Sequence, residues 1–127
     1  MELVEGTATI RSVDSFLDEL AAIGEAHDAV VQAVDARYVV DRRHLELATE
    51  LARRERARGS GIARDPGVEI LLYAAGRRQI NRALEMGVSE GTEQPLAVVV
   101  SGGEESTAAE EVREKLAPAE ALGEYDR

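Results

Sequence analysis

Hydrophobic and polar positions repeat with two different periods along the chain, which predicts strands and helices in turn. The first segment, residues 3–10 (LVEGTATI), reads as a short strand. A helix capped by Ser12 or Asp14 is predicted to follow and to run to about Ile23, because its apolar residues recur at helical spacing. Gly24 is the expected stop of this helix.

The next two elements are a strand and a longer helix. The valines in residues 30–34 predict a second strand, and its continuous apolar character indicates that both of its faces are mostly covered. Asp41 can cap a helix from about Arg42 to Arg58. Its expected apolar side consists of two pairs spaced four residues apart, Leu47 with Leu51 and Ala48 with Ala52.

The centre of the chain predicts two further helices. Asp65-Pro66 is a strong helix start, and the segment up to Gly76 is apolar on opposite sides. Such a helix is expected to be buried all round, by its own domain or by a partner. Another helix is predicted from about Arg77 to Met86.

The last third of the chain predicts a strand and an amphipathic helix. Residues 95–101 (PLAVVVS) are the clearest strand, and a helix from about Glu105 to Ala117 should end before Pro118. Residues 88–94 and the last ten are the expected mobile segments. The order β-α-β-α-α-α-β-α predicts one α/β domain (α+β mixed) over residues 1–117, followed by a tail over 118–127. Its small mixed sheet should have about three to four strands packed with a central group of helices.

Composition narrows the class of protein. The chain has no cysteine, which excludes disulfides and thiolate zinc sites. Its longest apolar runs fall far short of the roughly 20 residues that a membrane helix needs, and no basic region leads into an apolar segment at the amino terminus. A cytoplasmic location with no membrane partner is therefore expected.

The charge is unevenly distributed. The formal net charge is -10, yet residues 37–82 hold eleven arginines against six acids, and the remainder holds four cations against nineteen acids. Lys115 is the only lysine. Many acids with almost no lysine favour a protein that works in high salt, where ions screen self-repulsion. The alternative is the acidic bias of a GC-rich genome.

The sequence offers little that resembles a catalytic or metal site. His27 and His44 have no ligand-like spacing with carboxylates, so a structural or helix-surface role is expected for both. The glycine turn SGGEEST lacks the lysine of a phosphate loop and carries acids where phosphate would lie. The acidic pairs Glu104-Glu105 and Glu110-Glu111 are interpreted as solubility charges on a solvated helix. We therefore expect no enzyme activity, cofactor or metal.

The arginines divide into two groups. Arg53, Arg54 and Arg58 fit a solvated helix face with ion pairs inside the helix. Arg77 and Arg78 fit that interpretation less well, because they follow Gly76 at a helix start, where free N–H groups and the helix dipole already favour an anion. Two arginines there favour a site for phosphate or carboxylate.

A family resemblance covers this region. Residues 44–88 open with His44-Leu45, continue through the run EILLY and then AAGRRQI, and end with Gly87 after Ala83-Leu84. This segment resembles the core of the small kinase-binding subunit of the KEOPS complex, the TPRKB-like family, of archaeal type. The element order and the strand PLAVVVSG fit over most of the remaining chain.

The resemblance implies a mixed α/β fold and a subunit that is not itself an enzyme. Such a subunit binds the kinase/ATPase subunit of KEOPS, and through it joins a sugar-kinase-like catalytic subunit and a dimerising subunit. The complex adds threonylcarbamoyl to the adenosine beside the anticodon of tRNA. Archaeal members also hold the single-stranded 3′ CCA end of the tRNA.

Carried onto this sequence, the resemblance implies a pocket for the CCA end, made by Ala75, Gly76, Arg78, Gln79 and Ile80. Gln79 can read a base edge, and cations can position the strand by phosphate contacts. The expected cations are Arg77, Arg78 and Arg82, with Arg64 as a weaker addition. The kinase contact is placed at Tyr73 and Leu72, for which plain core packing is the alternative.

One departure from the family pattern affects these expectations. Members normally continue beyond ALGEYD with another helix and a closing strand, so this chain reads as a short member or a truncated sequence. An absent strand would leave a sheet edge open and bring the kinase interface into question. The alternative function is a general protein-interaction module with no role in nucleic-acid binding, which the acidic total charge favours.

Overall fold

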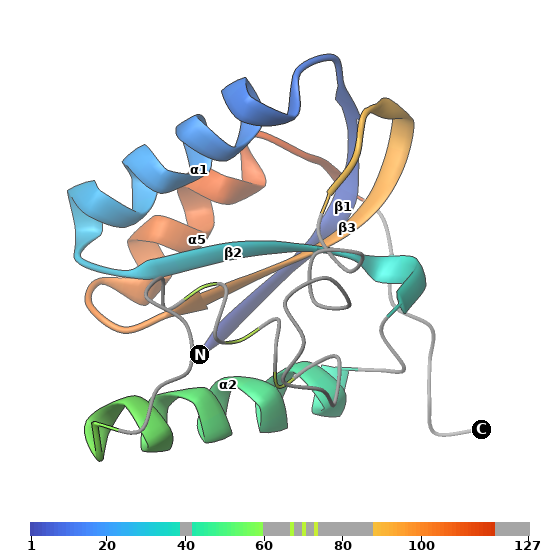
Figure 1. Ribbon diagram of the computed structural model, residues 1–127. Coiled ribbons are helices and arrows are strands. Elements are labelled where there is room, and N and C mark those ends of the chain that lie inside the picture. Colours follow the sequence, from blue (N-terminus) through green and yellow to red (C-terminus); the bar gives the residue numbers. More distant parts are fainter. Residues whose placement is uncertain (39–41, 60–66, 68–69, 71–72, 74–87, 119–127) are drawn as a thin grey trace.

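The computed structural model describes residues 1–38, 42–59, 67, 70, 73 and 88–118. Its elements are arranged around one sheet (Figure 1). In chain order they are β1 (Glu2–Ile10), α1 (Val13–His27), β2 (Val30–Asp35), a 3-10 turn (Ala36–Tyr38), α2 (Arg42–Ala57), β3 (Gly91–Ser101), α5 (Glu105–Arg113) and β4 (Ala117–Pro118).

The sheet has the strand order β2-β3-β1-β4. β1 pairs with β3 from Glu2 opposite Val100, and β2 and β4 pair with β3 and β1 respectively. The chain therefore forms two β-α-β units, β1-α1-β2 and β3-α5-β4, and each has a strand of the other inserted between its own two strands. This is the split arrangement of ferredoxin-like domains, with α2 and the residues after it inserted between the units.

All three strand pairings in the described part of the chain are antiparallel. A mixed sheet was expected because helices separate the predicted strands, which is typical of parallel neighbours. The parallel partners are present, but each pair has an antiparallel strand between its members. The mixed α/β class in a single small domain is confirmed.

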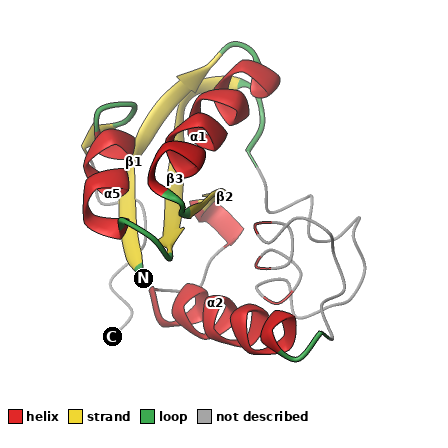
Figure 2. Cartoon of the chain, turned by 90° about the vertical axis from the view of Figure 1, so that its left-hand side faces the viewer, coloured by secondary structure: helices red, strands yellow, loops and turns green. Residues whose placement is uncertain are grey.

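Helices cover both faces of the sheet. α1 and α5 lie on one face and α2 lies on the other, which Figures 1 and 2 show from two directions. β3 is buried from both sides and alternates strictly: Leu96, Val98 and Val100 face α1 and α5, whereas Ala97 and Val99 face α2. This explains why its sequence is an unbroken apolar run.

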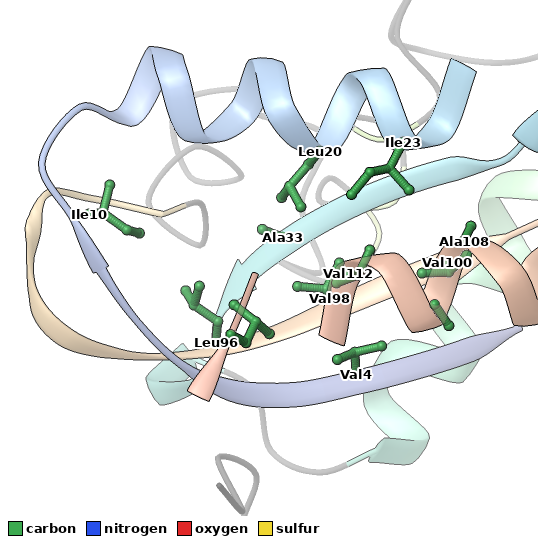
Figure 3. Close-up of a cluster of buried hydrophobic side chains, with 12 residues drawn as sticks. Val4, Ile10, Leu20, Ile23, Ala33, Leu96, Val98, Val100, Ala108 and Val112 are labelled. Carbon is green, nitrogen blue, oxygen red and sulfur yellow. The ribbon is translucent and has the colours of Figure 1, made fainter. Parts of the chain in front are cut away.

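Each face has its own hydrophobic cluster. Among the described residues, the cluster under α1 and α5 is the larger and consists mainly of branched residues with small alanines between them (Figure 3). Its fully buried large side chains include Leu20, Leu96, Val98, Val100 and Val112. The cluster under α2 joins that helix to Leu3, Val34, Ala97, Val99 and Ile70. Both clusters are therefore built from branched aliphatic residues and alanines, in agreement with the low aromatic content of the sequence.

The end of α1 differs from the prediction. Ser12 caps the helix as expected, since its hydroxyl oxygen accepts a hydrogen bond from the N–H of Ser15 at 3.3 Å. Gly24 does not end it, because the helix continues to His27 and stops at Asp28 in the left-handed conformation, with φ of 54°. Gly24 is needed for packing instead: a Cβ there would lie 2.7 Å from the carbonyl oxygen of Ala29.

Two further boundaries move. Residues 91–94, expected to be mobile, extend β3 and pair with β1 from Ala8 to Ile10. α5 ends at Arg113, so the expected last turn is absent and Ala117–Pro118 form β4 against Gly6 instead. A Cβ on Gly6 would lie 2.6 Å from the carbonyl oxygen of Ala117, so this close pairing requires glycine.

The buried side of α2 is narrower than predicted. Ala48 and Ala52 are buried together with Leu45 and Thr49, at the spacing of one helical face. Leu47 is 59% exposed and Leu51 is only half-buried, so the predicted leucine pair does not contribute a second apolar row. The hydroxyl of Thr49 is satisfied by donating to the carbonyl oxygen of Leu45 at 2.8 Å.

The two helices predicted over residues 65–76 and 77–86 lie largely outside the described residues. Within the first, Gly67, Ile70 and Tyr73 are helical. The expected cap at Asp41 also lies outside them. None of the helices in the described part of the chain is long and apolar enough to cross a bilayer.

Candidate functional site

Most of the predicted site residues lie outside the described residues. These are Arg64, Leu72, Ala75, Gly76, Arg77, Arg78, Gln79, Ile80 and Arg82. Tyr73 is described: it is half-buried and packs against the cluster that contains Leu45 and Ile70. The packing agrees with the core alternative for Tyr73, while its exposed part leaves the kinase contact as a prediction.

α2 precedes the predicted site residues in the chain and carries five arginines. Two of its exposed arginines are paired along the helix: Arg42 with Glu46 at 3.0 Å and Arg54 with Glu50 at 3.8 Å. Just after the helix, Arg58 pairs with Glu55 at 3.4 Å. The interpretation of Arg54 and Arg58 as a solvated, ion-paired face is confirmed. Exposed pairs of this kind contribute at most about 1 kcal/mol each, so these side chains can exchange partners easily.

The two helical layers carry opposite charge. α2 holds five arginines and three glutamates, a net charge of +2. On the other face, α1 holds four acids and no lysine or arginine, and α5 holds three glutamates and one arginine. A polyanion that approaches the described part of the molecule therefore meets the more favourable potential on the α2 side.

Two backbone N–H groups in the glycine turn between β3 and α5 are occupied by protein acceptors. The N–H of Gly102 donates to Glu105 Oε2 at 2.6 Å, and the N–H of Glu104 donates to the carbonyl oxygen of His27 at 2.9 Å. The hydrogen bond from Gly102 holds the pKa of Glu105 below its ordinary value, although burial opposes the shift and the Met1 ammonium and Arg53 support it. The exclusion of a phosphate loop agrees with this geometry.

His27 lies between two carboxylates. Its Nδ1 is 3.0 Å from Glu104 Oε1 and its Nε2 is 2.5 Å from Glu111 Oε2. These contacts, that of Glu104 first, raise the pKa of His27 above 6.5, and burial opposes them. The structural role expected for His27 is thus a specific bridge between α1 and α5.

The glutamates of α5 are more than solubility charges. Glu104 and Glu111 bind His27, and Glu105 is 27% exposed and pairs with the Met1 ammonium at 3.0 Å. The interpretation of these residues as solubility charges is therefore incomplete for Glu104, Glu105 and Glu111, which also pair with other groups. Glu110 is exposed, as that interpretation expected.

A buried carboxylate and its arginine lie at the end of β2. Asp35 is 4% exposed and receives two bonds from the Arg37 guanidinium, Nε to Oδ1 at 3.0 Å and Nη2 to Oδ2 at 2.7 Å. The N–H of Arg37 also donates to Oδ1 at 3.0 Å. Burial raises the pKa of Asp35, but the Arg37 contacts outweigh it and hold the pKa below 3.8. This arrangement braces the turn into the segment before α2.

The surface hollows of the described region include two on the acidic side. One of about 300 Å³ lies between α1 and α5, and its described lining includes Glu19, Ile23, Glu111 and Lys115. The other, of about 370 Å³, lies between the end of α1 and β2, where Glu25, Asp28 and valines line it. No arginine lines either hollow in the described region. Within the same residues, no group of three or more His, Cys, Asp or Glu is arranged to hold a metal ion.

Comparison with known proteins decides the family. The family model described as "Kinase binding protein CGI-121" matches residues 10–123, which is all but the first nine and last four residues. The chain belongs to the CGI-121 family. This confirms the resemblance to the KEOPS kinase-binding subunit, because the match extends from the last residue of β1 through α1, β2, α2, β3, α5 and β4. A search of curated proteins found no significant match.

The CGI-121 match indicates the class of partner. The sequence did not predict the contacts of Asp35 with Arg37 or of His27 with its two glutamates. Asp35 and Arg37 are two residues apart, a spacing that also occurs by chance in any charged chain. His27 meets Glu104 and Glu111, which are 77 and 84 residues away, so only the topology brings them together. The αL position at Asp28 was also not anticipated, although Asp is among the residues that tolerate it.

Proposed function

We propose that this CGI-121 family protein is a non-catalytic, substrate-recruiting subunit of a KEOPS-type complex. In this role it binds the kinase/ATPase subunit and the 3′ CCA end of tRNA during threonylcarbamoyladenosine modification. The observation that carries the proposal is the family match over residues 10–123, which includes the whole arginine-rich segment and every predicted site residue.

Kinase binding is the better supported half. The family is described as kinase binding, and the chain matches it over both faces of the sheet. Tyr73 and Leu72 are the proposed contacts. The half-buried Tyr73 can pack on the α2-side core with one part of its ring and offer the rest to a partner. Through the kinase the subunit would join the sugar-kinase-like and dimerising subunits.

Recruitment of tRNA is supported by charge and by the small-residue turn. The α2 side is cationic while the α1 and α5 side is anionic. The proposed CCA pocket (Ala75, Gly76, Arg77, Arg78, Gln79, Ile80, with Arg82 and Arg64) continues the arginine-rich segment along the chain. Small residues let bases approach the backbone closely, and arginines hold the phosphates.

The setting of this role is proposed to be the cytoplasm of a salt-adapted archaeon. The excess of acids over cations and the near absence of lysine support it. A non-catalytic role agrees with the described residues, where His27 and the buried Asp35 have their polar atoms engaged by protein partners.

Co-purification with the kinase/ATPase subunit of the same organism tests the kinase half. We expect a stable complex on gel filtration, weakened when Tyr73 is changed to alanine and kept when the exposed Leu47 is changed to alanine. Failure of the wild-type chain to form a complex would contradict the proposal.

Binding of tRNA with and without its CCA tail tests the RNA half. Arg78→Glu combined with Gln79→Ala should abolish the preference for the intact tail while the fold and kinase binding are kept. The matched control is Arg43→Glu, an equal charge reversal on exposed α2. Equal affinity for both tRNAs would favour the protein-interaction module instead.

A further inference from the structure

The ring of His27 joins the carboxyl end of α1 to α5. Each ring nitrogen contacts a carboxylate from a different turn of the chain, Glu104 just before α5 and Glu111 inside it. The side chain of His27 is 13% exposed, whereas those of Glu104 and Glu111 are 68% and 43% exposed. The histidine is therefore sheltered between α1 and α5, and the two acids reach it from the solvent side.

Counting donors gives the protonation state that this geometry needs. An ionised carboxylate only accepts hydrogen bonds, and a neutral imidazole has a single N–H. Two carboxylates can be satisfied at once only by the imidazolium ion, which carries an N–H on both nitrogens. Loss of one proton leaves a ring nitrogen lone pair facing a carboxylate oxygen, which is repulsive.

The backbone at the same place adds a third connection. The carbonyl oxygen of His27 accepts from the N–H of Glu104 at 2.9 Å, and Asp28 leaves the helix with φ of 54°. Gly103 opposite has φ of 53°, and a Cβ there would collide with the carbonyl oxygens of His27 and Asp28. The turn after α1 and the turn before α5 are thus in close contact, and His27 connects them through both its ring and its backbone carbonyl.

Glu25 and Asp28, the other charged residues at the end of α1, are both exposed. Farther along, Lys115 just after α5 pairs with Glu19 of α1 at 2.9 Å. β2, which also packs on α1, begins with valines, and its titratable residue Asp35 lies roughly 17 Å away along the strand. The groups that contact the His27 ring in the described structure are therefore the two glutamates.

We propose that His27 is a pH-dependent clamp, which as an imidazolium fastens α5 to the end of α1 and on losing a proton releases α5. This device acts within the fold and is independent of the proposed kinase and tRNA contacts. The two hydrogen bonds that raise the pKa of His27 place the release above the ordinary value of 6.5.

The sign of the effect follows from linkage. A group whose pKa is raised on folding contributes stability that is fully present below its unfolded pKa and is lost as pH rises through the folded pKa. The clamp should therefore hold near pH 6 and weaken toward pH 9. Added salt should weaken it as well, because both acids are partly exposed.

An NMR titration of the histidine rings tests the proposal directly. The chain has two histidines, so His44→Gln leaves a single set of ring signals that belongs to His27. We expect its midpoint above 6.5 and a lower midpoint in both Glu104→Gln and Glu111→Gln. A midpoint at or below 6.5 in the His44→Gln protein would overturn the clamp.

Hydrogen exchange then tests whether the clamp holds α5. Protection of the amides of Ala108, Ala109 and Val112 should fall several-fold from pH 6 to pH 9, after correction for intrinsic exchange, while α2 amides change less. His27→Gln, which cannot titrate, should remove this difference between the helices. If α5 and α2 lose protection equally in the wild type, the proposed release is wrong.

Discussion

Asp35 shows how one buried charge is tolerated in this fold. It is 4% exposed, yet its carboxylate is engaged by the guanidinium and the N–H of Arg37. Arg37 itself is half exposed and also donates to Gln94 Oε1 at 3.1 Å. The pair is therefore asymmetric: loss of the arginine leaves a buried, uncompensated carboxylate, which costs more than the loss of an exposed cation.

Arg37→Ala should destabilise the protein by about 2 to 3 kcal/mol at pH 7, because Asp35 loses its charged partner in a buried position. In the wild type, Asp35 has a lowered pKa, so its contribution is present above 3.8 and is lost as pH falls through the folded pKa. In Arg37→Ala, burial dominates the pKa of Asp35 and raises it, so the contribution of Asp35 to stability falls as pH rises. Urea unfolding at several pH values should show the gap between the two proteins narrowing below about pH 4.

Arg37→Lys is the matched control for this prediction. It keeps the positive charge but loses the two-pronged contact, so its loss of stability should lie between those of the wild type and Arg37→Ala. A gap that stays constant from pH 7 to pH 3 would show that packing rather than charge accounts for the effect.

At the scale of an element, α2 depends on a single row of buried side chains. Leu45→Ala should lower the free energy of unfolding by about 2 to 5 kcal/mol, because Leu45 is fully buried at 0% exposure and its removal leaves a cavity. Leu47→Ala, one half-turn away and 59% exposed, should stay within about 0.5 kcal/mol of the wild type.

Chemical denaturation of both variants checks this contrast. The two substitutions remove the same atoms from the same helix, so differences in helix propensity cancel. Similar losses for the two leucines would mean that another segment of the protein covers Leu47.

Periodicity predicted most of the elements but not their ends. β1, β2, α2 and the centre of β3 agree with the sequence pattern, because burial on one or both faces leaves a direct trace in the residue types. The prediction that Gly24 ends α1 was wrong, because glycine is required there by the close carbonyl oxygen of Ala29 and not by the end of a helix. β4 was missed because a pairing of two residues depends on Gly6, more than a hundred residues earlier.

The site could be predicted only where chemistry is local in the sequence. The ion pair of Glu50 with Arg54 follows from helical spacing and is confirmed. The contacts of His27 depend on a tertiary arrangement that places α5 beside α1, and no spacing rule encodes it. For Arg77, Arg78 and Gln79 the sequence gives the chemistry of the side chains, and their role remains a prediction.

For the whole molecule, charge separates along the layers as well as along the chain. The acidic α1 and α5 layer contributes strongly to the net charge of -10, and like charges there repel one another through solvent. This repulsion opposes the compact state, and mobile ions screen it over a Debye length of about 10 Å at 0.1 M salt.

The free energy of unfolding should therefore rise, on the order of 1 kcal/mol, between about 0.1 M and 1 M potassium chloride. Urea is the suitable denaturant because it is uncharged. Glu110→Gln combined with Glu114→Gln, two exposed acids, should raise stability at low salt and reduce the salt dependence. A steady fall in stability with salt would show that ion pairs outweigh the repulsion.

The interleaved sheet has a consequence for how the protein is made. β1 pairs with β3, and Glu2 lies opposite Val100. Neither β1 nor β2 can therefore pair with β3, the strand between them, until β3 has been synthesised. At typical synthesis rates of roughly 5 to 20 residues per second, the nascent chain waits several seconds with β1 and β2 unpaired. Contacts so distant in sequence also slow folding after release. A chaperone would therefore be of most use to this protein during synthesis, while the amino-terminal half is made and β3 is not.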